Sequence, residues 1–385
     1  MPDPLDALGA KYGSEPLGDM TQHKPKRRPI DFERDEREKV VSAAAAEPIV
    51  GAAATDEEKV VELTLRPNLL GEFTGQESVK ENLQIAIQAA KKRGEPMEHV
   101  LLSGPPGLGK TTLAHIIAHE MGAKITATSG PAIERAGDLI GILTNLNRGD
   151  VLFIDEIHRM SKIVEEFIYP AMENYNIDFV IDKGPYAKTI KFSLKNFTLI
   201  GATTRSGLLS APLRDRFGIM AHLDFYEPAD LIRIIERSAS LLGIAIDRES
   251  ASAIAARSRG TPRIANRLLR RVRDYAQVKT EGILTAQSTL KALEGQGVDG
   301  KGLDPMDRRV LKAIIDIYDG GPVGIDSLAA TLNEESDTIV DVVEPYLLKA
   351  GFLKRTARGR SVTRQAYEHF GIKTRATSSN DSLFE

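Results

Sequence analysis

The stretch that decides the fold is Val100-Leu-Leu-Ser-Gly-Pro-Pro-Gly-Leu-Gly-Lys-Thr-Thr-Leu-Ala114. Its apolar start, residues 100–102, is typical of a buried strand, and the residues from Thr111 onward are typical of a helix. A segment of the form Gly-x4-Gly-Lys-Thr joins the two, between Gly104 and Thr111. Because the loop stands between a strand and a helix, the stretch predicts a phosphate-binding loop.

The residue types in this loop suit a nucleoside triphosphate. Gly104, Gly107 and Gly109 let the backbone adopt positive φ and bring free N–H groups close to phosphates. Lys110 would place a positive charge on the outer phosphates, and the Thr111 hydroxyl would ligate a Mg²⁺ that bridges them. We therefore expect Mg-ATP or Mg-GTP as the ligand. A glycine-rich turn that only joins a strand to a helix is the alternative.

The composition favours a multidomain protein that lies outside membranes. The chain has 385 residues, of which 42% are hydrophobic, and this is enough for two or three domains. It has no run of eighteen apolar residues and no signal sequence, so we expect a cytoplasmic protein without membrane contact. The absence of cysteine excludes disulfides, thiolate chemistry and cysteine zinc sites. A net charge of −3 does not decide about nucleic acid, because a local basic patch is what binds phosphate.

Two further apolar strands are expected to end beside the loop. Residues 151–154 are apolar and lead into Asp155 and Glu156, a Walker B pattern. The active groups of a parallel sheet gather at the carboxyl ends of its strands, so Asp155 would hold Mg²⁺ through water and Glu156 would polarise the attacking water. The apolar run 197–202 ends in Thr203 and Thr204, whose hydroxyls could sense a terminal phosphate. Helices between these strands predict an α/β fold with a doubly wound parallel sheet.

The rest of the chain divides by its pattern. Residues 1–60 show no apolar period and are assigned no fold, and their basic cluster at 24–28 is interpreted as a solvated tail rather than a nucleic-acid contact. Residues 77–93 predict a helix, and residues 176–196 predict a hairpin with its turn at 182–185. From residue 228 the pattern is helical only, at 231–242, 249–257 and 264–278, which predicts a helical lid. Seven arginines fall between Arg257 and Arg273, and one near Gly260-Thr-Pro could reach the nucleotide.

The C-terminal part follows a glycine-rich linker, 295–302, and predicts a winged helix-turn-helix. Helices are expected at 307–318, 326–332 and 335–349, and strands at 352–355 and 359–363. Five cations surround that strand pair: Lys354, Arg355, Arg358, Arg360 and Arg364. The pattern favours a DNA-binding wing, and a winged helix used only for protein contacts is the alternative.

Five motifs succeed one another along the chain: Gly104-Pro-Pro-Gly-Leu-Gly-Lys-Thr-Thr112, Phe153-Ile-Asp-Glu-Ile-His-Arg159, Gly201-Ala-Thr-Thr-Arg205, Pro212-Leu-Arg-Asp-Arg-Phe-Gly218 and Gly260-Thr-Pro-Arg-Ile-Ala-Asn-Arg267. In this order they resemble the bacterial RuvB family, AAA+ ATPases that drive branch migration of Holliday junctions. The first motif is shared by many ATPases, whereas the last three in this order are specific to the family. The resemblance runs from about Leu65 to about Ile372 and leaves the first sixty residues unexplained.

The resemblance implies a role for each matching residue. Lys110, Asp155, Glu156, Thr204 and Arg216 would be catalytic, with Thr204 as sensor 1 and Arg216 as the arginine finger that reaches a neighbouring subunit's nucleotide. Thr111 and Asp155 would hold the metal, and Arg355 and Arg360 would contact DNA. The nucleotide would be bound by Leu65, Arg66, Gly107, Gly109, Lys110, Thr111, Thr112, Glu173, Asn174, Tyr175, Tyr226 and Arg263, the last as sensor 2. Asn174 stands where the family has an aspartate.

The resemblance also implies an architecture, ligands and partners. The domains would be a tail at 1–60, an AAA+ large ATPase domain with a parallel sheet at 61–225, a small helical lid domain at 226–298 and a winged-helix domain at 299–385. ATP and Mg²⁺ would be the cofactors. The partners would be duplex DNA, other copies of the chain in a homo-hexamer, and RuvA on a four-way junction, docked by the hairpin around Gly184. The RuvC resolvase is a further candidate partner.

Two other functions remain as alternatives. One is a clamp loader or replication initiator, and the other is a module in which ATP only switches ring assembly on DNA. Glu156 and Arg216 argue against a pure switch, which needs neither a water-polarising acid nor a finger. The wing directly after the lid argues against a clamp loader.

Overall fold

The computed structural model describes residues 64–180, 189–280, 282 and 284–373. The tail expected at 1–60 and the turn expected at 182–185 lie outside the described residues.

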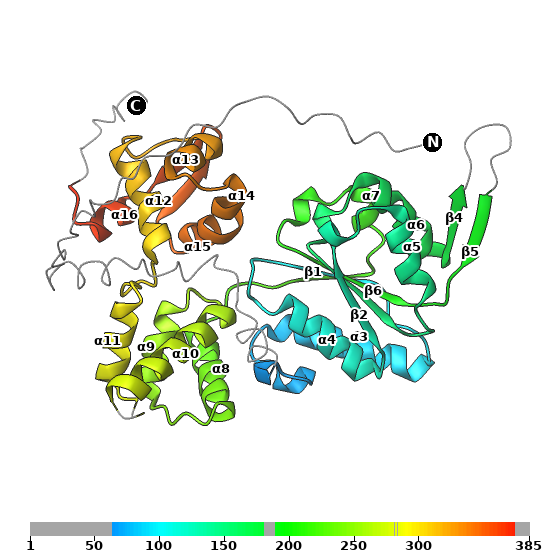
Figure 1. Ribbon diagram of the computed structural model, residues 1–385, viewed down its shortest axis with the longest axis horizontal. Helices are drawn as coiled ribbons and strands as arrows, with labels where there is room; N and C mark the ends of the chain where they lie inside the picture. Colours follow the sequence, from blue (N-terminus) through cyan, green and yellow to red (C-terminus); the bar gives the residue numbers. More distant parts are fainter. Residues whose placement is uncertain (1–63, 181–188, 281, 283, 374–385) are drawn as a thin grey trace, which may run out of the picture. The chain divides into compact units, whose positions relative to one another are not determined.

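A parallel sheet forms the first folded part (Figure 1). Its strands are β1 (Val100–Ser103), β2 (Ile125–Ser129), β3 (Val151–Asp155), β6 (Thr198–Thr203) and β7 (Ile219–His222), in the order β2-β3-β6-β1-β7. Ser103 pairs with Thr203 on β6, and Ile154 pairs with Gly201 on the same strand. β1, β3 and β6 therefore end at one edge of the sheet. This arrangement brings the phosphate-binding loop, the paired carboxylates and the strand-end hydroxyls together.

Helices cover both faces of this sheet, as the predicted doubly wound fold requires. Alternate strand residues point to opposite faces. Leu102, Val151 and Phe153 belong to the core that includes α3 (Glu77–Arg93) and α4 (Lys110–Met121). Leu101, Leu152 and Ile154 belong to the core that includes α5 (Ala136–Thr144) and α6 (Lys162–Asn174). The central strands β1, β3 and β6 are buried on both faces, which explains their largely apolar sequences.

The helix predicted at 77–93 is present with these bounds, and Gly94 closes it in the left-handed conformation, with φ of 66°. The predicted hairpin consists of β4 (Asn176–Val180) and β5 (Thr189–Ser193), which pair antiparallel, with Ile177 opposite Phe192. A short helix, α7 (Ala211–Arg214), precedes Arg216.

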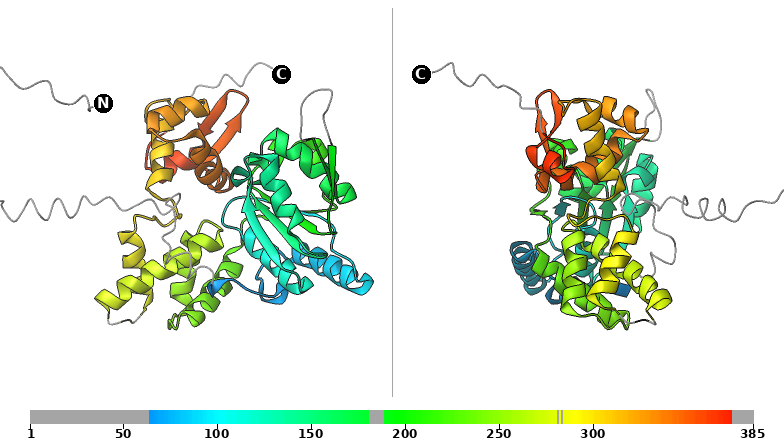
Figure 2. Two further views of the ribbon diagram at one scale, coloured as in Figure 1. Left: turned by 45° about the vertical axis from the view of Figure 1, so that its right-hand side comes forward. Right: turned by 90° about the vertical axis from the view of Figure 1, so that its left-hand side faces the viewer.

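The lid is helical, as predicted, and Figure 2 shows its helices gathered in a bundle without strands. They are α8 (Pro228–Leu241), α9 (Arg248–Arg257), α10 (Pro262–Lys279) and α11 (Ala286–Gly295). They pack through fully buried side chains that include Leu231, Ile254, Leu268 and Leu293. We did not predict α11 from the sequence. The Thr285 side chain caps it by accepting a hydrogen bond from the Ser288 N–H. This capping residue was a local signal for the helix, but the apolar pattern that follows it is too short to indicate a helix by itself.

The C-terminal part is a winged helix, as predicted. Its helices are α12 (Pro305–Asp316), α13 (Ile325–Leu332), α14 (Ser336–Thr338), a π-helical segment (Ile339–Val343), α15 (Glu344–Lys349) and α16 (Arg364–His369). The wing is the antiparallel pair β8 (Leu353–Thr356) and β9 (Gly359–Val362). The third predicted helix, 335–349, has the right extent, but its middle part is π-helical rather than α-helical. Pro345 lacks an N–H and its ring clashes with the carbonyl four residues earlier, which disfavours a regular α-helix there.

Candidate functional site

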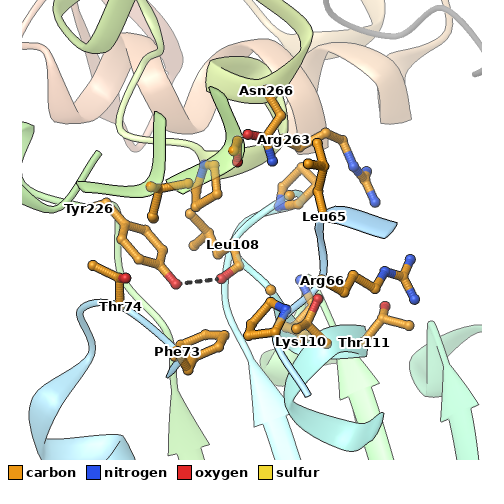
Figure 3. A pocket seen from close by; sticks show the side chains of 18 of the residues that line it. Leu65, Arg66, Phe73, Thr74, Leu108, Lys110, Thr111, Tyr226, Arg263 and Asn266 are labelled. Carbon is orange, nitrogen blue, oxygen red and sulfur yellow. Dashed lines mark hydrogen bonds between the residues drawn. The ribbon is translucent and has the colours of Figure 1, made fainter. Parts of the chain in front are cut away.

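A pocket lies over the phosphate-binding loop and receives residues from three parts of the chain (Figure 3). The loop itself forms its floor, the segment 65–67 forms one wall, and lid residues such as Arg263 and Asn266 cover it. The predicted residues that line the pocket are Leu65, Arg66, Gly107, Gly109, Lys110, Thr111, Thr112, Asp155, Glu156, Tyr226 and Arg263. Most of the nucleotide residues expected from the sequence thus meet in one cavity.

The loop keeps its shape because its glycines have no side chains. Gly104 has φ of 137°, and a Cβ there would collide with the carbonyl oxygen of Leu223. Gly107 has φ of 80°, and a Cβ there would lie 2.7 Å from the Thr261 methyl group of the lid. Positive φ and close approach of other atoms both exclude larger residues. The loop is therefore able to aim its N–H groups into the pocket.

Lys110 is held inside the loop. Its side chain is buried, and its Nζ donates hydrogen bonds to the carbonyl oxygens of Gly104 (2.7 Å) and Pro105 (2.9 Å). Burial lowers the pKa of Lys110 to about 8, although the nearby Glu156 and Asp155 carboxylates act in the opposite direction. Most Lys110 side chains therefore still carry their charge at pH 7, and a phosphate would favour the charged form further.

We expect ATP binding to be linked to protonation of Lys110. With a pKa of about 8 in the free chain, about half of the molecules carry neutral Lys110 at pH 8. Because phosphate binds the charged form, binding should take up about half a proton at pH 8 and about a tenth at pH 7. ATP affinity should accordingly fall as the pH rises above 8. Calorimetric titration in two buffers of different ionisation enthalpy measures this uptake, and equal proton uptake at both pH values would contradict the assignment.

Glu156 occupies an unusual backbone position beside the loop. It has φ of 46° and ψ of 47°, a left-handed conformation that costs free energy for a non-glycine residue and is common at functional sites. Its Oε2 accepts a hydrogen bond from the Thr204 hydroxyl at 3.2 Å and lies 3.3 Å from Nδ1 of His158. Thr204 itself does not line the pocket, and its sensor role stays a prediction. The structure thereby joins the Walker B acid to the strand-end hydroxyl.

His158 is a further functional candidate, for which the sequence pattern indicated no role. Its Nδ1 lies 2.9 Å from the Thr203 hydroxyl, and its ring is buried next to Glu156. Burial lowers the pKa of His158, against the opposing influence of the Glu156 carboxylate. The imidazole is therefore mainly neutral at pH 7. Its Nδ1 therefore meets the Thr203 hydroxyl and lies beside the Glu156 carboxylate without forming an ion pair with it.

Besides Thr204, four residues predicted for the nucleotide site lie outside the pocket of their own chain. Arg216, Glu173, Asn174 and Tyr175 are placed by α6 and the loop after α7, and α6 packs in the core on the opposite sheet face from α4. Nη2 of Arg216 pairs with Oε1 of Glu173 at 2.8 Å, and its guanidinium lies 4.6 Å from the centre of the Tyr169 ring. Tyr175 packs on the Phe197 ring, with centroids 5.8 Å apart. Nucleotide contact by these residues stays a prediction.

Other pocket residues were missed from the sequence. The Arg237 side chain, on α8, donates a hydrogen bond to the Leu65 carbonyl at 2.8 Å and so fixes the wall of the pocket. Tyr226, which was predicted, donates a hydrogen bond from its hydroxyl to the Leu108 carbonyl at 3.1 Å (Figure 3). Asn266 lines the pocket one turn after Arg263 on α10. Helical spacing from Arg263 was a signal that could have found Asn266, whereas nothing local singled out Arg237.

The residues present fit Mg-ATP. The pocket combines a buried cation at Lys110, a hydroxyl at Thr111 and a carboxylate at Asp155, and Mg²⁺ bound with phosphates commonly needs only one or two protein oxygen ligands. Among the residues that the structure describes, no cluster of three or more histidine, cysteine or acidic side chains could hold a metal by itself. None of the described helices is long and apolar enough to cross a membrane.

Both predicted DNA-contacting arginines lie on the wing. Arg355 on β8 is directly opposite Arg360 on β9, and each pairs with Glu344, a residue that the sequence did not single out. Lys354 and Arg358 are exposed on the same hairpin. The wing therefore carries the positive charge that a phosphate-contacting surface needs.

A phosphate-binding loop on a parallel sheet, a strand ending in two carboxylates and a helical lid over the pocket define an ATP hydrolase of the AAA+ class. Family models make the class specific. The P-loop domain of the Holliday junction DNA helicase RuvB matches residues 65–223, the RuvB AAA lid domain matches 226–299, and the RuvB C-terminal winged helix domain matches 300–371. The chain belongs to the RuvB family.

Solved structures agree. A mutant of Thermotoga maritima RuvB is 54% identical to this chain and superposes on it with a TM-score of 0.76. The match covers 80% of this chain and 99% of the Thermotoga chain. A structure described as the Thermotoga maritima RuvB Holliday junction branch migration motor has the same identity and coverage and a TM-score of 0.75. The match of the winged-helix model directly after the lid favours this family over a clamp loader.

Proposed function

We propose that this chain drives branch migration at Holliday junctions, as a homo-hexameric ring that moves duplex DNA through a junction held by RuvA. The observation that carries the proposal is the position of Arg216. The pocket of its own chain is lined by the loop, Asp155, Glu156 and Arg263, whereas Arg216 lies outside it on Glu173. A complete catalytic site would then combine the pocket of one subunit with Arg216 of the next, which requires a ring or filament.

The residues divide the work of hydrolysis. Bound Mg²⁺ would be held by Thr111 and Asp155 and would neutralise charge on the phosphates. Lys110 leaves the Gly104 and Pro105 carbonyls to contact the outer phosphates. Glu156, which accepts a hydrogen bond from the Thr204 hydroxyl, would accept another from the attacking water and polarise it. Arg263, at the start of α10, would contact the phosphates and so couple nucleotide binding to the position of the lid.

The partners follow from the same proposal. The β4–β5 hairpin is separate from the central sheet and would dock on RuvA, and the wing would contact the duplex. A protein that moves Holliday junctions, which are recombination intermediates, would also cooperate with the RuvC resolvase and act in the cytoplasm.

A gel assay of a synthetic four-way junction tests the function. With RuvA, ATP and Mg²⁺, the chain should convert the junction to two duplex products, and each single omission should abolish conversion. A Lys110→Ala chain is the matched negative control. Conversion that persists without ATP would contradict a motor.

We expect Arg355→Ala and Arg360→Ala each to weaken duplex binding uniformly across sequences. Each phosphate contact contributes a slope of about −0.9 to the plot of log affinity against log salt concentration, so each variant should flatten the plot by about that amount and lose roughly five- to tenfold in affinity at 0.1 M salt. Fluorescence anisotropy with two duplexes of unrelated sequence, measured at several salt concentrations, gives both quantities. Unchanged affinity and slope would show that the wing does not face the DNA.

A further inference from the structure

The wing brings two arginines together that should repel. Arg355 and Arg360 are directly opposite each other across β8 and β9, so their side chains share one face of the hairpin. Like charges at directly opposite positions destabilise a strand pair. A buried acid compensates: Glu344, the first residue of α15, is 1% exposed in its side chain and lies beneath both guanidinium groups.

Glu344 binds both arginines in the same way. Its Oε1 accepts hydrogen bonds from Nε of Arg355 (2.7 Å) and Nε of Arg360 (3.1 Å). Its Oε2 accepts hydrogen bonds from Nη2 of Arg355 (2.8 Å) and Nη2 of Arg360 (3.1 Å). In both guanidinium groups these bonds use the side edge, which is formed by Nε and Nη2. Paired bonds of this kind fix the orientation of a guanidinium plane, which a single bond does not.

This pairing leaves the other edge of each guanidinium available. A guanidinium has five N–H donors, and Glu344 takes two from each arginine. The end edge, formed by Nη1 and the second Nη2 hydrogen, has no partner recorded within the described residues. The side chain of Arg355 is 54% exposed and that of Arg360 is 17% exposed. The two end edges, each a pair of parallel N–H donors that we call a fork, therefore lie close together. The fork of Arg355 belongs to the more exposed side chain.

The charge balance supports the same conclusion. Burial alone would raise the pKa of Glu344, but the hydrogen bonds from Arg355 and Arg360 outweigh it, and the pKa is lowered. The carboxylate is thus ionised at neutral pH, and its stabilising effect is lost only as the pH falls through this lowered pKa. Two arginines and one glutamate leave a net charge of about +1 among these three residues, and Arg205 adds a further positive charge near Arg355. The site keeps an attraction for phosphate while the repulsion between the arginines is relieved.

We propose that Glu344 is a positioning residue for DNA binding: it holds the side edges of Arg355 and Arg360 so that their end edges form a preorganised fork for phosphates of the duplex. This rests on the proposed contact between wing and DNA. The physical advantage is that the side-chain entropy of two arginines is lost on folding rather than on binding.

The first test changes shape and keeps charge. Lysine has one nitrogen and cannot bond both carboxylate oxygens while offering a second fork. Arg355→Lys should therefore lose roughly five- to tenfold in duplex affinity at 0.1 M salt, nearly as much as Arg355→Ala, with a salt slope lower by about 0.9. Arg93→Lys is the matched control, because Arg93 also pairs through its Nε with a glutamate (Glu95, 2.9 Å) but lies at the end of α3, outside the wing; it should bind normally. The full chain and a fluorescein-labelled duplex of mixed sequence are used throughout.

The second test removes the acid. Glu344→Gln makes the wing more positive, so if Glu344 only screened the arginines, the variant would bind duplex more tightly. Positioning predicts the opposite, a roughly fivefold or greater loss at 0.1 M salt that is not additive with Arg355→Ala but is additive with Arg358→Ala. Thermal unfolding followed by circular dichroism verifies that the winged helix is intact. If Glu344→Gln does not fold, the comparison of Arg355→Lys with Arg93→Lys decides.

The outcomes separate this inference from the proposed function. Normal affinity and salt slope in Arg355→Lys, together with a loss in Arg355→Ala, would mean that charge alone acts, and the positioning role would be overturned. Tighter binding by folded Glu344→Gln would overturn it as well. No effect of Arg355→Ala would instead refute the contact between wing and DNA on which the inference rests.

Discussion

Arg216→Ala should lower ATP hydrolysis roughly 10³- to 10⁵-fold while leaving ATP binding intact, because an arginine finger stabilises charge only in the transition state. The reason lies in its position. Arg216 is anchored on Glu173 and over the Tyr169 ring, outside the pocket of its own chain. Arg233→Ala, which removes an exposed arginine of α8, is the control and should hydrolyse ATP normally.

Mixing variants distinguishes a finger in trans from a structural arginine. Arg216→Ala subunits keep an intact pocket, and Lys110→Ala subunits keep Arg216. If the finger reaches a neighbour, rings that contain both should regain part of the ATPase activity that each lacks alone. Mixed rings, verified by differently tagged subunits, that stay as inactive as either variant alone would place Arg216 in its own subunit or in folding.

Lys110→Ala and Glu156→Gln should fail at different steps. Removal of the Lys110 charge should weaken ATP binding by roughly 10- to 100-fold, because a hydrogen bond to a charged group is worth about 1.5–3 kcal/mol. Glu156→Gln keeps the shape of the side chain and removes the base, so it should bind ATP normally and hydrolyse it roughly 10²- to 10⁴-fold more slowly.

Separate measurement of ATP affinity and single-turnover hydrolysis resolves the two defects. Glu166→Gln is the matched control for charge, since Glu166 is an exposed residue of α6. A Glu156→Gln chain that hydrolyses ATP at the normal rate would refute the role of Glu156. Normal affinity in Lys110→Ala would refute the phosphate contact.

Sequence alone was sufficient where function depends on neighbouring residues. The loop from Gly104 to Thr111 needs glycines and a lysine at set spacings, and the Walker B acids directly follow their strand. Strand and helix types were predictable because the core strands are apolar throughout and α3 carries a clear helical period and a glycine stop. The wing was predictable because its hairpin and cations lie in one short segment.

Only the tertiary structure decided which distant side chains meet. Arg237 reaches Leu65 across 172 positions, and His158 and Thr204 meet at Glu156 because β3 and β6 are hydrogen-bonded neighbours. Glu344 lies eleven and sixteen positions from the arginines that it holds, on a helix whose apolar pattern gave no sign of a buried acid. A local pattern records spacing along one element, whereas burial and ion pairing depend on how elements pack. The sequence by itself therefore determined the chemistry of the loop and strand ends, and packing determined which residues orient them.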